Sequence, residues 1–300
     1  MTIMKVMVLF NPVSGRGQSA AAAQDVEAAL TSAGHTAVCT PTRMEPTPSW
    51  LDEALREVEL AVIVGGDGAV RMAGAAAVRT GTPIYHFPCG TENLFAREFG
   101  MTRDPAILIR AIERWRIRRI DVGTANGLTF LLMLSIGYDA EVVHDLASTR
   151  GKSISHWTYL KPMLRQFLKW KPPVLSMEID GQRVVNNQPG FVVVGNSREY
   201  GWRFNPVGRA VIDDGAIDVA FFPAHGKFGL LCWSIRCRFR RHFRHPKLVY
   251  VRGRQVALTS EHPRRFQVDG DPPEQLGTTS EGPWRLNIGI IPGAISVLEP

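Results

Sequence analysis

The sequence lacks any apolar run that could cross a bilayer, because none approaches the roughly 20 residues that a membrane-spanning helix needs. It also lacks a clear secretion signal. The apolar start of the chain ends at Asn11-Pro12 with no small-residue cleavage site, so we expect a first β-strand there. These two absences argue against an integral membrane protein and against export, and we expect a cytoplasmic protein.

Cysteine is scarce and irregularly placed. The four cysteines, Cys39, Cys89, Cys232 and Cys237, form no CxxC pair and no metal-ligand pattern. A disulfide framework and a structural zinc site are therefore not expected, which suits the reduced thiols of the cytoplasm. HExxH is also missing, and the eight histidines are scattered, so a surface or core role is the default for each.

The common nucleotide-binding fingerprints are absent as well. Gly151-Lys152-Ser153 has the form of the end of a Walker A loop, but Leu146 stands where its first glycine would be. No GxGxxG follows the first predicted strand, and no His-Arg-Asp loop of a protein kinase occurs. P-loop enzymes, Rossmann dinucleotide enzymes and protein kinases are therefore excluded at the level of motifs.

What is present is an ordinary globular composition with a basic bias. The 300 residues are 45% hydrophobic and 21% charged, with a formal net charge of +7. The length allows one large domain or two. The charge permits an anionic partner such as a nucleotide, a nucleic acid or a membrane surface, without choosing among them.

Three polar turns each follow a predicted strand in the first part of the chain. The strands are Lys5–Phe10, Leu60–Val64 and Pro83–Phe87, and the turns are residues 11–17, 65–68 and 88–93. Predicted helices separate these strands, which indicates a parallel sheet with helices on both faces. Because ligands of such sheets bind beyond the carboxyl ends of the strands, the three turns should converge on one edge.

The turn Gly65-Gly66-Asp67-Gly68 is the centre of this pattern. Its glycines permit positive φ angles and the close approach of a ligand, and the helix that follows would offer N–H groups to a phosphate. The carboxylate of Asp67 would repel that phosphate unless Mg²⁺ bridges the two or Asp67 handles a proton. The alternative is a tight strand–helix turn in which Asp67 is the N-cap residue.

Near residue 122 the pattern changes to short alternating stretches punctuated by glycine, proline and asparagine, which predicts an antiparallel sandwich. The predicted strands are Thr129–Ile136, Val174–Ile179, Phe191–Gly195, Ala216–Phe222, Arg254–Thr259, Arg265–Val268 and Arg285–Ile291. The predicted fold class is an α/β N-terminal domain, with a parallel sheet and helices on both sides, over residues 1–121. An all-β, sandwich-like C-terminal domain follows over residues 122–292.

Two predicted helices in this second part, Trp157–Lys171 and Phe228–His245, combine apolar, aromatic and basic residues. Each is either a helix packed on the sandwich with a solvated charged end or a contact with an anionic membrane. We do not expect nucleic acid as a partner, because no recognition motif accompanies the charge.

Five motifs occur in order along the chain: Asn11–Gly15, Gly65–Gly68, Gly90–Arg97, Asp213–Val219 and Val268–Asp271. Together they make the sequence resemble the diacylglycerol kinase catalytic-domain family, which includes bacterial lipid kinases and sphingosine kinases and is related to NAD kinases. The resemblance covers almost the whole chain. It implies a nucleotide-binding α/β domain followed by a β-sandwich for the lipid substrate, with residues 293–300 returning to complete the first domain.

The resemblance also implies ATP and Mg²⁺ as cofactors and a role for individual residues. ATP would contact Asn11, Pro12, Val13, Ser14, Gly15, Thr40, Gly65, Gly66, Asp67, Gly68, Ala69, Val70, Arg71 and Thr91. Mg²⁺ would be held by the side chain of Asp214 and by carbonyls near Val211 and Ala216. Asp271, in the usual acidic position, or Asp269 beside it would be the catalytic carboxylate, with Asp67 organising metal or phosphate.

The chemistry of phosphoryl transfer agrees with these roles. A lipid hydroxyl must lose its proton as it attacks the γ-phosphorus, and a carboxylate within hydrogen-bond reach can accept that proton. The structural alternative for Asp269-Gly270-Asp271 is a type I′ hairpin turn. For Asp213-Asp214-Gly215 a turn and a metal role are compatible, because such turns expose carbonyl groups.

The sequence departs from the family pattern at four positions. Ala69, Arg71 and Met72 replace the usual threonine, asparagine and glutamate after the glycine-rich turn. Leu94 replaces an acidic residue, for which the nearby Glu92 is a substitute. These changes leave room for an unusual nucleotide preference, a different substrate or a weakened kinase.

We therefore expect a cytoplasmic kinase, peripheral to the membrane, that transfers the γ-phosphate of ATP to the hydroxyl of a lipid (diacylglycerol-like, sphingoid or related). The alternatives are a soluble NAD-kinase-like enzyme and a non-catalytic member that binds nucleotide or lipid. The expected partners are a lipid substrate and an anionic membrane surface, and a homodimer is left open.

Overall fold

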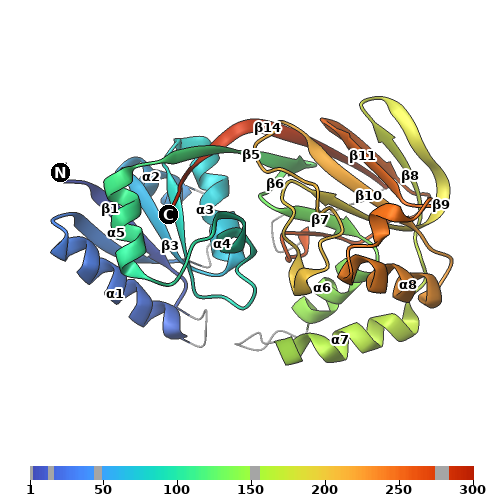
Figure 1. The fold of residues 1–300 in the computed structure, drawn as a ribbon, viewed down its shortest axis with the longest axis horizontal. Helices are drawn as coiled ribbons and strands as arrows, with labels where there is room; N and C mark the ends of the chain where they lie inside the picture. The colour runs from blue at the N-terminus through green and yellow to red at the C-terminus, as the bar shows by residue number, and fades with distance from the viewer. Residues whose placement is uncertain (1–2, 13–16, 44–48, 149–155, 274–283) are drawn as a thin grey trace. The chain divides into compact units, whose positions relative to one another are not determined.

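The computed structural model describes residues 3–12, 17–43, 49–148, 156–273 and 284–300, drawn in Figure 1. These residues form two compact units. The first comprises Met1–Ile120 and Gly293–Pro300, and the second comprises Asp121–Arg150 and Ile154–Pro292. The expected ATP contacts Val13, Ser14 and Gly15 lie outside the described residues.

The first unit is built around a parallel sheet. Its strands are ordered β4-β3-β1-β2, with β1 at Lys5–Phe10, β2 at Thr36–Pro41, β3 at Leu60–Gly65 and β4 at Ile84–Pro88. The end of β14 (Arg285–Leu298) adds to this sheet beside β4, through Val297 and Ile84. β3 is buried along its whole length. A strand buried on both faces has a continuous apolar sequence, which explains the run Leu-Ala-Val-Ile-Val.

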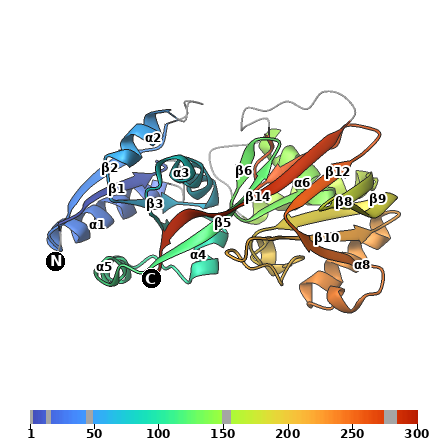
Figure 2. The same cartoon turned by 90° about the horizontal axis from the view of Figure 1, so that it is seen from above.

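Helices cover both faces of this sheet. They are α1 (Gln18–Ser32), α2 (Ser49–Arg56), α3 (Asp67–Thr80), α4 (Leu94–Phe99) and α5 (Pro105–Arg114). Figure 2 shows α1 and α5 on one face and α2 and α3 on the other. In α1 the buried side chains Ala22, Val26 and Leu30 recur every four residues, so one stripe of the helix packs on the sheet.

The second unit is an antiparallel, sandwich-like structure. One sheet has the order β13-β7-β9-β10-β11, and the other has the order β9-β8-β12-β14. The strands are β7 (Met133–Ile136), β8 (Val174–Ile179), β9 (Gln182–Gly195), β10 (Ile217–Pro223), β11 (Val249–Gly253), β12 (Gln255–Thr259) and β13 (Phe266–Val268). β9 belongs to both sheets, since its first half pairs with β8 and its second half with β7 and β10.

Side chains that alternate along these strands fill two separate cores. Val194 and Phe221 point into the space between the sheets, where they meet Leu258 and other apolar residues of the opposite sheet. The neighbouring residues Val193 and Phe222 face the other way and are covered by helices. The helices of this unit are α6 (Tyr138–Ser148), α7 (His156–Lys169), α8 (Lys227–Arg238) and the 3₁₀ helices η2 (Gly201–Arg203) and η3 (His242–Arg244).

The predicted fold class is confirmed: an α/β N-terminal domain with a parallel sheet precedes an antiparallel, sandwich-like C-terminal domain. A long strand, β5 (Ile117–Ala125), passes from the first unit into the second, where it forms a hairpin with β6 (Leu128–Phe130). Among the described residues, no helix combines the length and the apolar character needed to cross a bilayer.

Two local predictions were wrong, and one helix was missed. The expected strand over residues 129–136 is two strands, because the N–H groups of Leu131 and Leu132 leave the ladder to bind a side-chain carboxylate. The expected helix over residues 228–245 ends at Arg238, since Arg240 takes a left-handed φ of 54°. The helix α6 was not expected at all.

Candidate active site

The carboxyl ends of the parallel strands are in register at one edge of the first unit. Phe10 of β1 lies beside Val64 of β3 and Pro41 of β2, and Val64 lies beside Phe87 of β4. The turns that begin at Asn11, Gly65 and Cys89 therefore start at the same edge, as the sequence predicted. Thr40, in β2, pairs with Leu9 of β1 one residue before this edge.

The two glycine-containing turns touch each other directly. The N–H of Cys89 donates to the carbonyl of Gly65 at 2.8 Å. A Cβ atom on Gly90 would lie 2.6 Å from the Cα of Gly66, so only glycine fits there without movement of the backbone. Asn93 closes the second turn, because its side chain accepts from the N–H of Gly90 at 2.8 Å and donates to the carbonyl of Gly90 at 2.9 Å.

Asp67 links these turns through its side chain. Gly66 is the N-cap residue of α3 and Asp67 is the first residue inside the helix, so the alternative in which Asp67 is the N-cap residue is wrong by one position. One carboxylate oxygen of Asp67 accepts the N–H of Phe95, in the first turn of α4, at 3.0 Å. A negative charge at the start of two helices is stabilising.

Some N–H groups that follow the first turn already donate hydrogen bonds within it. The N–H groups of Ala69 and Val70 donate to the carbonyl of Gly66 at 3.0 and 3.3 Å. Ala69 is also buried. Phosphate contacts from this turn would therefore come from the backbone of Gly66 to Gly68, while Thr91 is exposed on the neighbouring turn.

His86 supports the first turn and was missed by the sequence analysis. It is fully buried in β4, and its Nε2 lies 2.9 Å from the carbonyl oxygen of Gly65. A carbonyl can only accept, so Nε2 carries the hydrogen. Burial lowers the pKa of His86, although the nearby charge of Asp67 opposes this shift. The only signal in the sequence is a histidine between Tyr85 and Phe87 in an otherwise apolar strand.

The acidic substitute proposed for position 94 is already paired. Glu92 and Arg97 form an ion pair with an N–O distance of 3.4 Å. Leu94 is buried at the start of α4 and brings no charge to the site. The first unit therefore presents Asp67, rather than a cluster of carboxylates, next to the glycine-containing turns.

The acidic motif of the second unit is a tight hairpin. Val268 and Asp271 exchange two backbone hydrogen bonds of 2.9 and 3.0 Å, and the two residues between them have φ angles of 47° and 86°. These are the features of a type I′ turn, which confirms the structural alternative for this motif. The turn does not exclude a catalytic role, because Asp271, which ends the turn, is partly exposed.

The two carboxylates of the hairpin have different surroundings. The side chain of Asp269 is buried and accepts three backbone N–H groups, from Leu131 at 2.7 Å and from Leu132 and Met133 at 2.9 Å. Asp271 is partly exposed. Asp269 therefore anchors the hairpin, and Asp271 is the better candidate for proton transfer, although both catalytic roles remain predictions.

A buried polar network continues from the hairpin into the unit. The N–H of Gly270 donates to Gln267 at 2.7 Å, and Gln267 donates to the hydroxyl of Ser135 at 2.8 Å. Ser135 and Tyr200 both donate to the carboxylate of Asp139. Burial raises the pKa of Asp139 and of Tyr200. The sequence signal for this network was a single polar residue in each of two short apolar strands, Ser135 in β7 and Gln267 in β13.

The expected metal site has its carboxylate engaged by protein groups. Asp214 accepts the N–H of Ala216 at 3.1 Å with one oxygen and Nη2 of Arg252 at 2.5 Å with the other. Arg252 also lies 3.4 Å from the buried carboxylate of Asp218. Val211 is exposed. The guanidinium of Arg252 therefore occupies the carboxylate oxygen of Asp214 that a metal ion would need. The described residues do not fit a bound Mg²⁺ ion at this position.

Elsewhere in the described part of the chain, no group of three or more histidine, cysteine, aspartate or glutamate residues is arranged to hold a metal ion.

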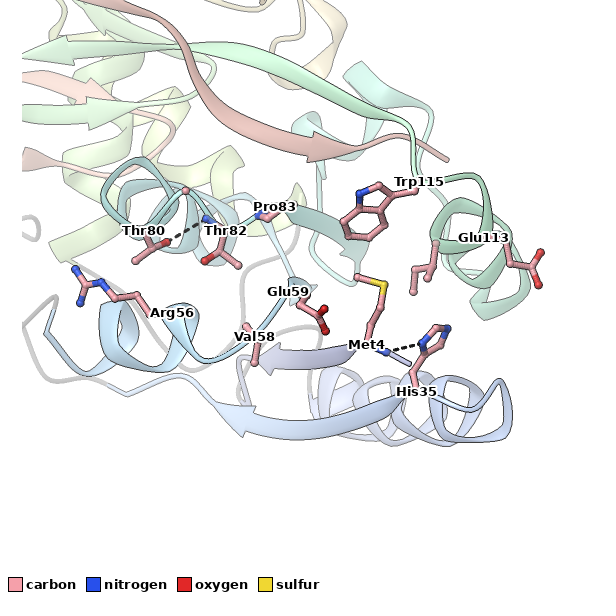
Figure 3. Close-up of a pocket in the computed structure, with 12 residues that line it drawn as sticks. Met4, His35, Arg56, Val58, Glu59, Thr80, Thr82, Pro83, Glu113 and Trp115 are labelled. Carbon is pink, nitrogen blue, oxygen red and sulfur yellow. Dashed lines mark hydrogen bonds between the residues drawn. The ribbon is translucent and has the colours of Figure 1, made fainter. Parts of the chain in front are cut away.

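A cavity of about 720 Å³ lies in the first unit (Figure 3). It is lined by Met4, Glu59 and Pro83, which directly precede β1, β3 and β4, and by His35, whose Nδ1 accepts the N–H of Met4 at 3.3 Å. The cavity therefore lies at the amino ends of the strands, opposite the edge that carries the turns.

Comparison with known families matches both parts of the chain. Residues 5–125 match the diacylglycerol kinase catalytic domain, and residues 133–299 match the YegS C-terminal NAD kinase beta sandwich-like domain. The second match alone covers more than half of the chain.

Curated relatives are similar over most of their length. A diacylglycerol kinase of Bacillus subtilis is 22% identical over 89% of both chains, and one of Mycobacterium tuberculosis is 28% identical over 76% of both. A "Probable lipid kinase YegS-like" of Pseudomonas aeruginosa is 26% identical over 79% of this chain and 75% of its own. By contrast, the chain spans about half (54%) of an uncharacterized Synechocystis protein, with 21% identity.

Among solved structures, a diacylglycerol kinase from Bacillus anthracis superposes with a TM-score of 0.71. The match covers 100% of this chain and 98% of the other, at 18% sequence identity. At that identity the similarity shows a common fold.

Proposed function

Because this chain belongs to the diacylglycerol kinase catalytic-domain family and carries the YegS C-terminal NAD kinase beta sandwich-like domain after its catalytic domain, we propose that it uses ATP to phosphorylate a lipid hydroxyl. The observation that carries the proposal most directly is the interlocked pair of glycine-containing turns, joined by Asp67, at the carboxyl edge of the parallel sheet. That edge is where sheets of this type bind their ligands.

In this proposal ATP arrives with Mg²⁺ as its counterion, and the metal is part of the substrate. The backbone of Gly66 to Gly68 and the turn with Thr91 bind and orient the phosphates. Mg²⁺ bound with ATP would supply charge neutralisation for the transferred group. The residues of the chain supply positioning, which is the larger part of catalysis in phosphoryl transfer.

We assign to Asp271 the role of general base, which accepts the proton of the acceptor hydroxyl. As the hydroxyl oxygen bonds to the γ-phosphorus and the bond from phosphorus to the β,γ-bridging oxygen breaks, the hydroxyl proton moves to the Asp271 carboxylate. ADP leaves with the electron pair of the broken bond. Asp269 keeps the hairpin in place through its three bonds to residues 131–133.

A lipid is the proposed acceptor because the curated relatives are named diacylglycerol kinase and lipid kinase. A diacylglycerol-like or sphingoid hydroxyl fits that class. We extend the proposal to action at the cytoplasmic face of a membrane, where ATP and a lipid substrate are both available.

Two competing functions are resolved by the same experiment. The second domain is named for its likeness to the NAD kinase sandwich, so NAD is the rival acceptor. The burial of Leu94 and the pairing of Glu92 with Arg97 favour the other rival, a protein that binds nucleotide without transferring phosphate.

The experiment presents purified protein with γ-labelled ATP, Mg²⁺ and a panel of acceptors. The panel contains diacylglycerol, a sphingoid base and monoacylglycerol in mixed micelles, with NAD in solution. We expect label in one or more lipids, and a rate about 10² to 10⁴ times lower for Asp271→Asn. Label in NAD alone would favour the first rival, and ATP binding without transfer to any acceptor would favour the second.

A further inference from the structure

The helix α8 is apolar on two opposite faces. Leu230, Trp233 and Cys237 are buried in the second core of the C-terminal unit. On the other side the side chains of Phe228, Leu231 and Ile235 are exposed, and Phe239, which caps the helix, continues their line. Phe228 is 79% exposed and Phe239 is 67% exposed. The spacing of three, four and four residues places these exposed side chains in one stripe, here called the α8 ridge.

The helix α7 repeats this arrangement. Leu160, Leu164 and Leu168 are all exposed by more than half and follow one another at four-residue spacing. The neighbouring face of the helix packs inward through Phe167, next to the buried Trp170. We call the three leucines the α7 ridge.

Both helices pack on the same hydrophobic core. Trp170 after α7 and Trp233 of α8 belong to one cluster with Phe222 of β10, and Phe191 of β9 packs against it. Figure 1 shows α7 and α8 on the side of the second unit that also carries α6. Their inner faces are therefore held by the fold, whereas the ridges contribute nothing to that core. Large exposed apolar patches of this kind mark interaction sites.

The charges within the two segments that carry the ridges have one sign, and Arg165 of α7 is paired with Asp145 of α6. Residues 156–173 and 227–248 contain no aspartate and no glutamate. On a helical projection Arg236 and Arg238 lie on either side of the α8 ridge, and α7 carries Lys161 and Lys169 beside its leucines. Further basic residues follow α8 in the chain, namely Arg240, Arg241, Arg244 and Lys247.

This combination selects one class of partner. A second copy of the chain docked ridge to ridge would bring like charges together with no acidic residue in either segment to pair with them. A nucleic acid would match the charge but would leave the phenylalanine and leucine side chains unburied. An anionic bilayer satisfies both features, since its acyl chains take up the ridges and its head groups pair with the cations.

We propose that the α7 and α8 ridges, with their basic borders, form the surface by which this protein docks on anionic membranes. The inference deepens the proposed lipid-kinase function by naming the surface from which the substrate is drawn. Its binding step needs neither ATP nor turnover, so it can be tested separately.

The test measures sedimentation of the purified protein with vesicles, in the absence of ATP. Vesicles of phosphatidylcholine alone are compared with vesicles that contain phosphatidylglycerol. We expect binding to the anionic vesicles that weakens as salt rises. Phe228→Gln combined with Ile235→Gln should weaken it at least tenfold, and Arg238→Gln combined with Arg241→Gln by about fivefold per residue at low salt.

Matched controls come from the first unit. Ile3 is 70% exposed, and Ile3→Gln removes an equally exposed apolar side chain. Arg114→Gln removes an exposed cation at the end of α5. Both should bind vesicles like the wild type. Because every changed residue is exposed or partly exposed, the melting temperatures should stay close to that of the wild type, which shows that the variants fold.

Three outcomes would overturn the docking surface. They are equal binding to neutral and anionic vesicles, no effect of the ridge variants, and a concentration-dependent dimer that the ridge variants abolish. Kinase activity on a monomeric short-chain diacylglycerol separates this inference from the proposed function. The ridge variants should keep that activity. If the wild type binds vesicles but phosphorylates no lipid, the proposed kinase function is rejected and the proposed docking surface is retained.

Discussion

The carboxylate of Asp67 accepts the backbone N–H of Phe95 at 3.0 Å, so a side chain from one glycine-containing turn caps the helix that follows the other. This bond joins α3 to α4 and holds Gly66 against Gly90. It gives Asp67 a structural task besides any contact with metal or phosphate. Substitutions that separate the hydrogen bond from the charge can distinguish the two.

We expect Asp67→Ala to lower the free energy of unfolding by about 1 kcal/mol, as the loss of a helix-capping acceptor does. Asp67→Asn retains an acceptor oxygen for Phe95 and should keep most of that stability. Both variants lose the charge and should lose lipid-kinase activity. Urea unfolding and the labelled-ATP assay measure the two effects. Full activity in Asp67→Asn would mean that the carboxylate acts only as a cap.

The close approach of the two turns predicts a steric effect at Gly90. A Cβ atom there would also lie 2.8 Å from Oδ1 of Asn93, so Gly90→Ala must displace the turn. We expect a loss of about 1–3 kcal/mol in stability and weaker ATP binding, measured by urea unfolding and by nucleotide titration. Gly201→Ala is the matched control, because its new Cβ would meet no atom within 4 Å. Equal behaviour of the two variants would contradict the predicted crowding.

The two carboxylates of the hairpin should respond in opposite ways to the same change. Asp269→Asn can keep an oxygen for the N–H groups of Leu132 and Met133 but then turns its N–H₂ toward the N–H of Leu131, and we expect it to cost about 1–3 kcal/mol of stability. Asp271→Asn should leave the melting temperature nearly unchanged and remove activity. Calorimetry and the lipid assay give the two readouts. A stable, inactive Asp269→Asn variant would transfer the catalytic role to Asp269.

The guanidinium of Arg252 at Asp214 predicts a structure that is indifferent to Mg²⁺. The melting temperature of the wild type, without ATP, should be the same in EDTA and in millimolar MgCl₂. Arg252→Gln frees an oxygen of Asp214. We expect that variant to be stabilised by Mg²⁺, since ligands that bind only the folded state raise its stability. Adding Asp214→Asn should abolish the effect. Stabilisation of the wild type by Mg²⁺ would show that the ion displaces Arg252 from the carboxylate of Asp214.

Burial of His86 predicts a loss of stability in acid. The pKa of His86 is lowered in the folded protein from its ordinary value of 6.5. Below about pH 6.5 the unfolded chain therefore binds a proton that the folded chain does not, and stability falls as the pH drops. His86→Gln keeps an N–H donor for Gly65 but cannot be protonated. Its free energy of unfolding should decline less than that of the wild type between pH 7.5 and 5, by at most about 1.4 kcal/mol per pH unit. Parallel pH profiles would contradict this assignment.

The fold class could be predicted because its signals are local. The buried strand β3 is a continuous apolar run. The type I′ turn at Asp269-Gly270 is likewise encoded by two adjacent residues. Even the shared edge of the polar turns follows from strand order alone, since parallel strands place their carboxyl ends together. The need for glycine at position 66 is not local, because Gly66 has an extended backbone and a Cβ there would lie 3.2 Å from the Cα of Gly90.

The misplaced elements were decided by distant contacts. The predicted strand over residues 129–136 breaks because Leu131 binds Asp269, 138 residues further on. The helix predicted as far as His245 stops at Arg238, and the buried His242 then bonds to the carbonyl of Pro206. Neither partner can be identified from the residues next to it in the sequence.

The sequence by itself determined the local features from which the site is proposed: a glycine-containing turn with Asp67 after a buried strand, and an acidic hairpin in a second, sandwich-like domain. Only the tertiary structure decided what each carboxylate does. In the folded protein Asp67 accepts a hydrogen bond from Phe95, Asp269 accepts hydrogen bonds from the backbone of residues 131–133, and Asp214 accepts one from Arg252. The physical reason is that a carboxylate bonds to the donors that folding brings within about 3 Å, and those donors come from strands and helices remote in the chain.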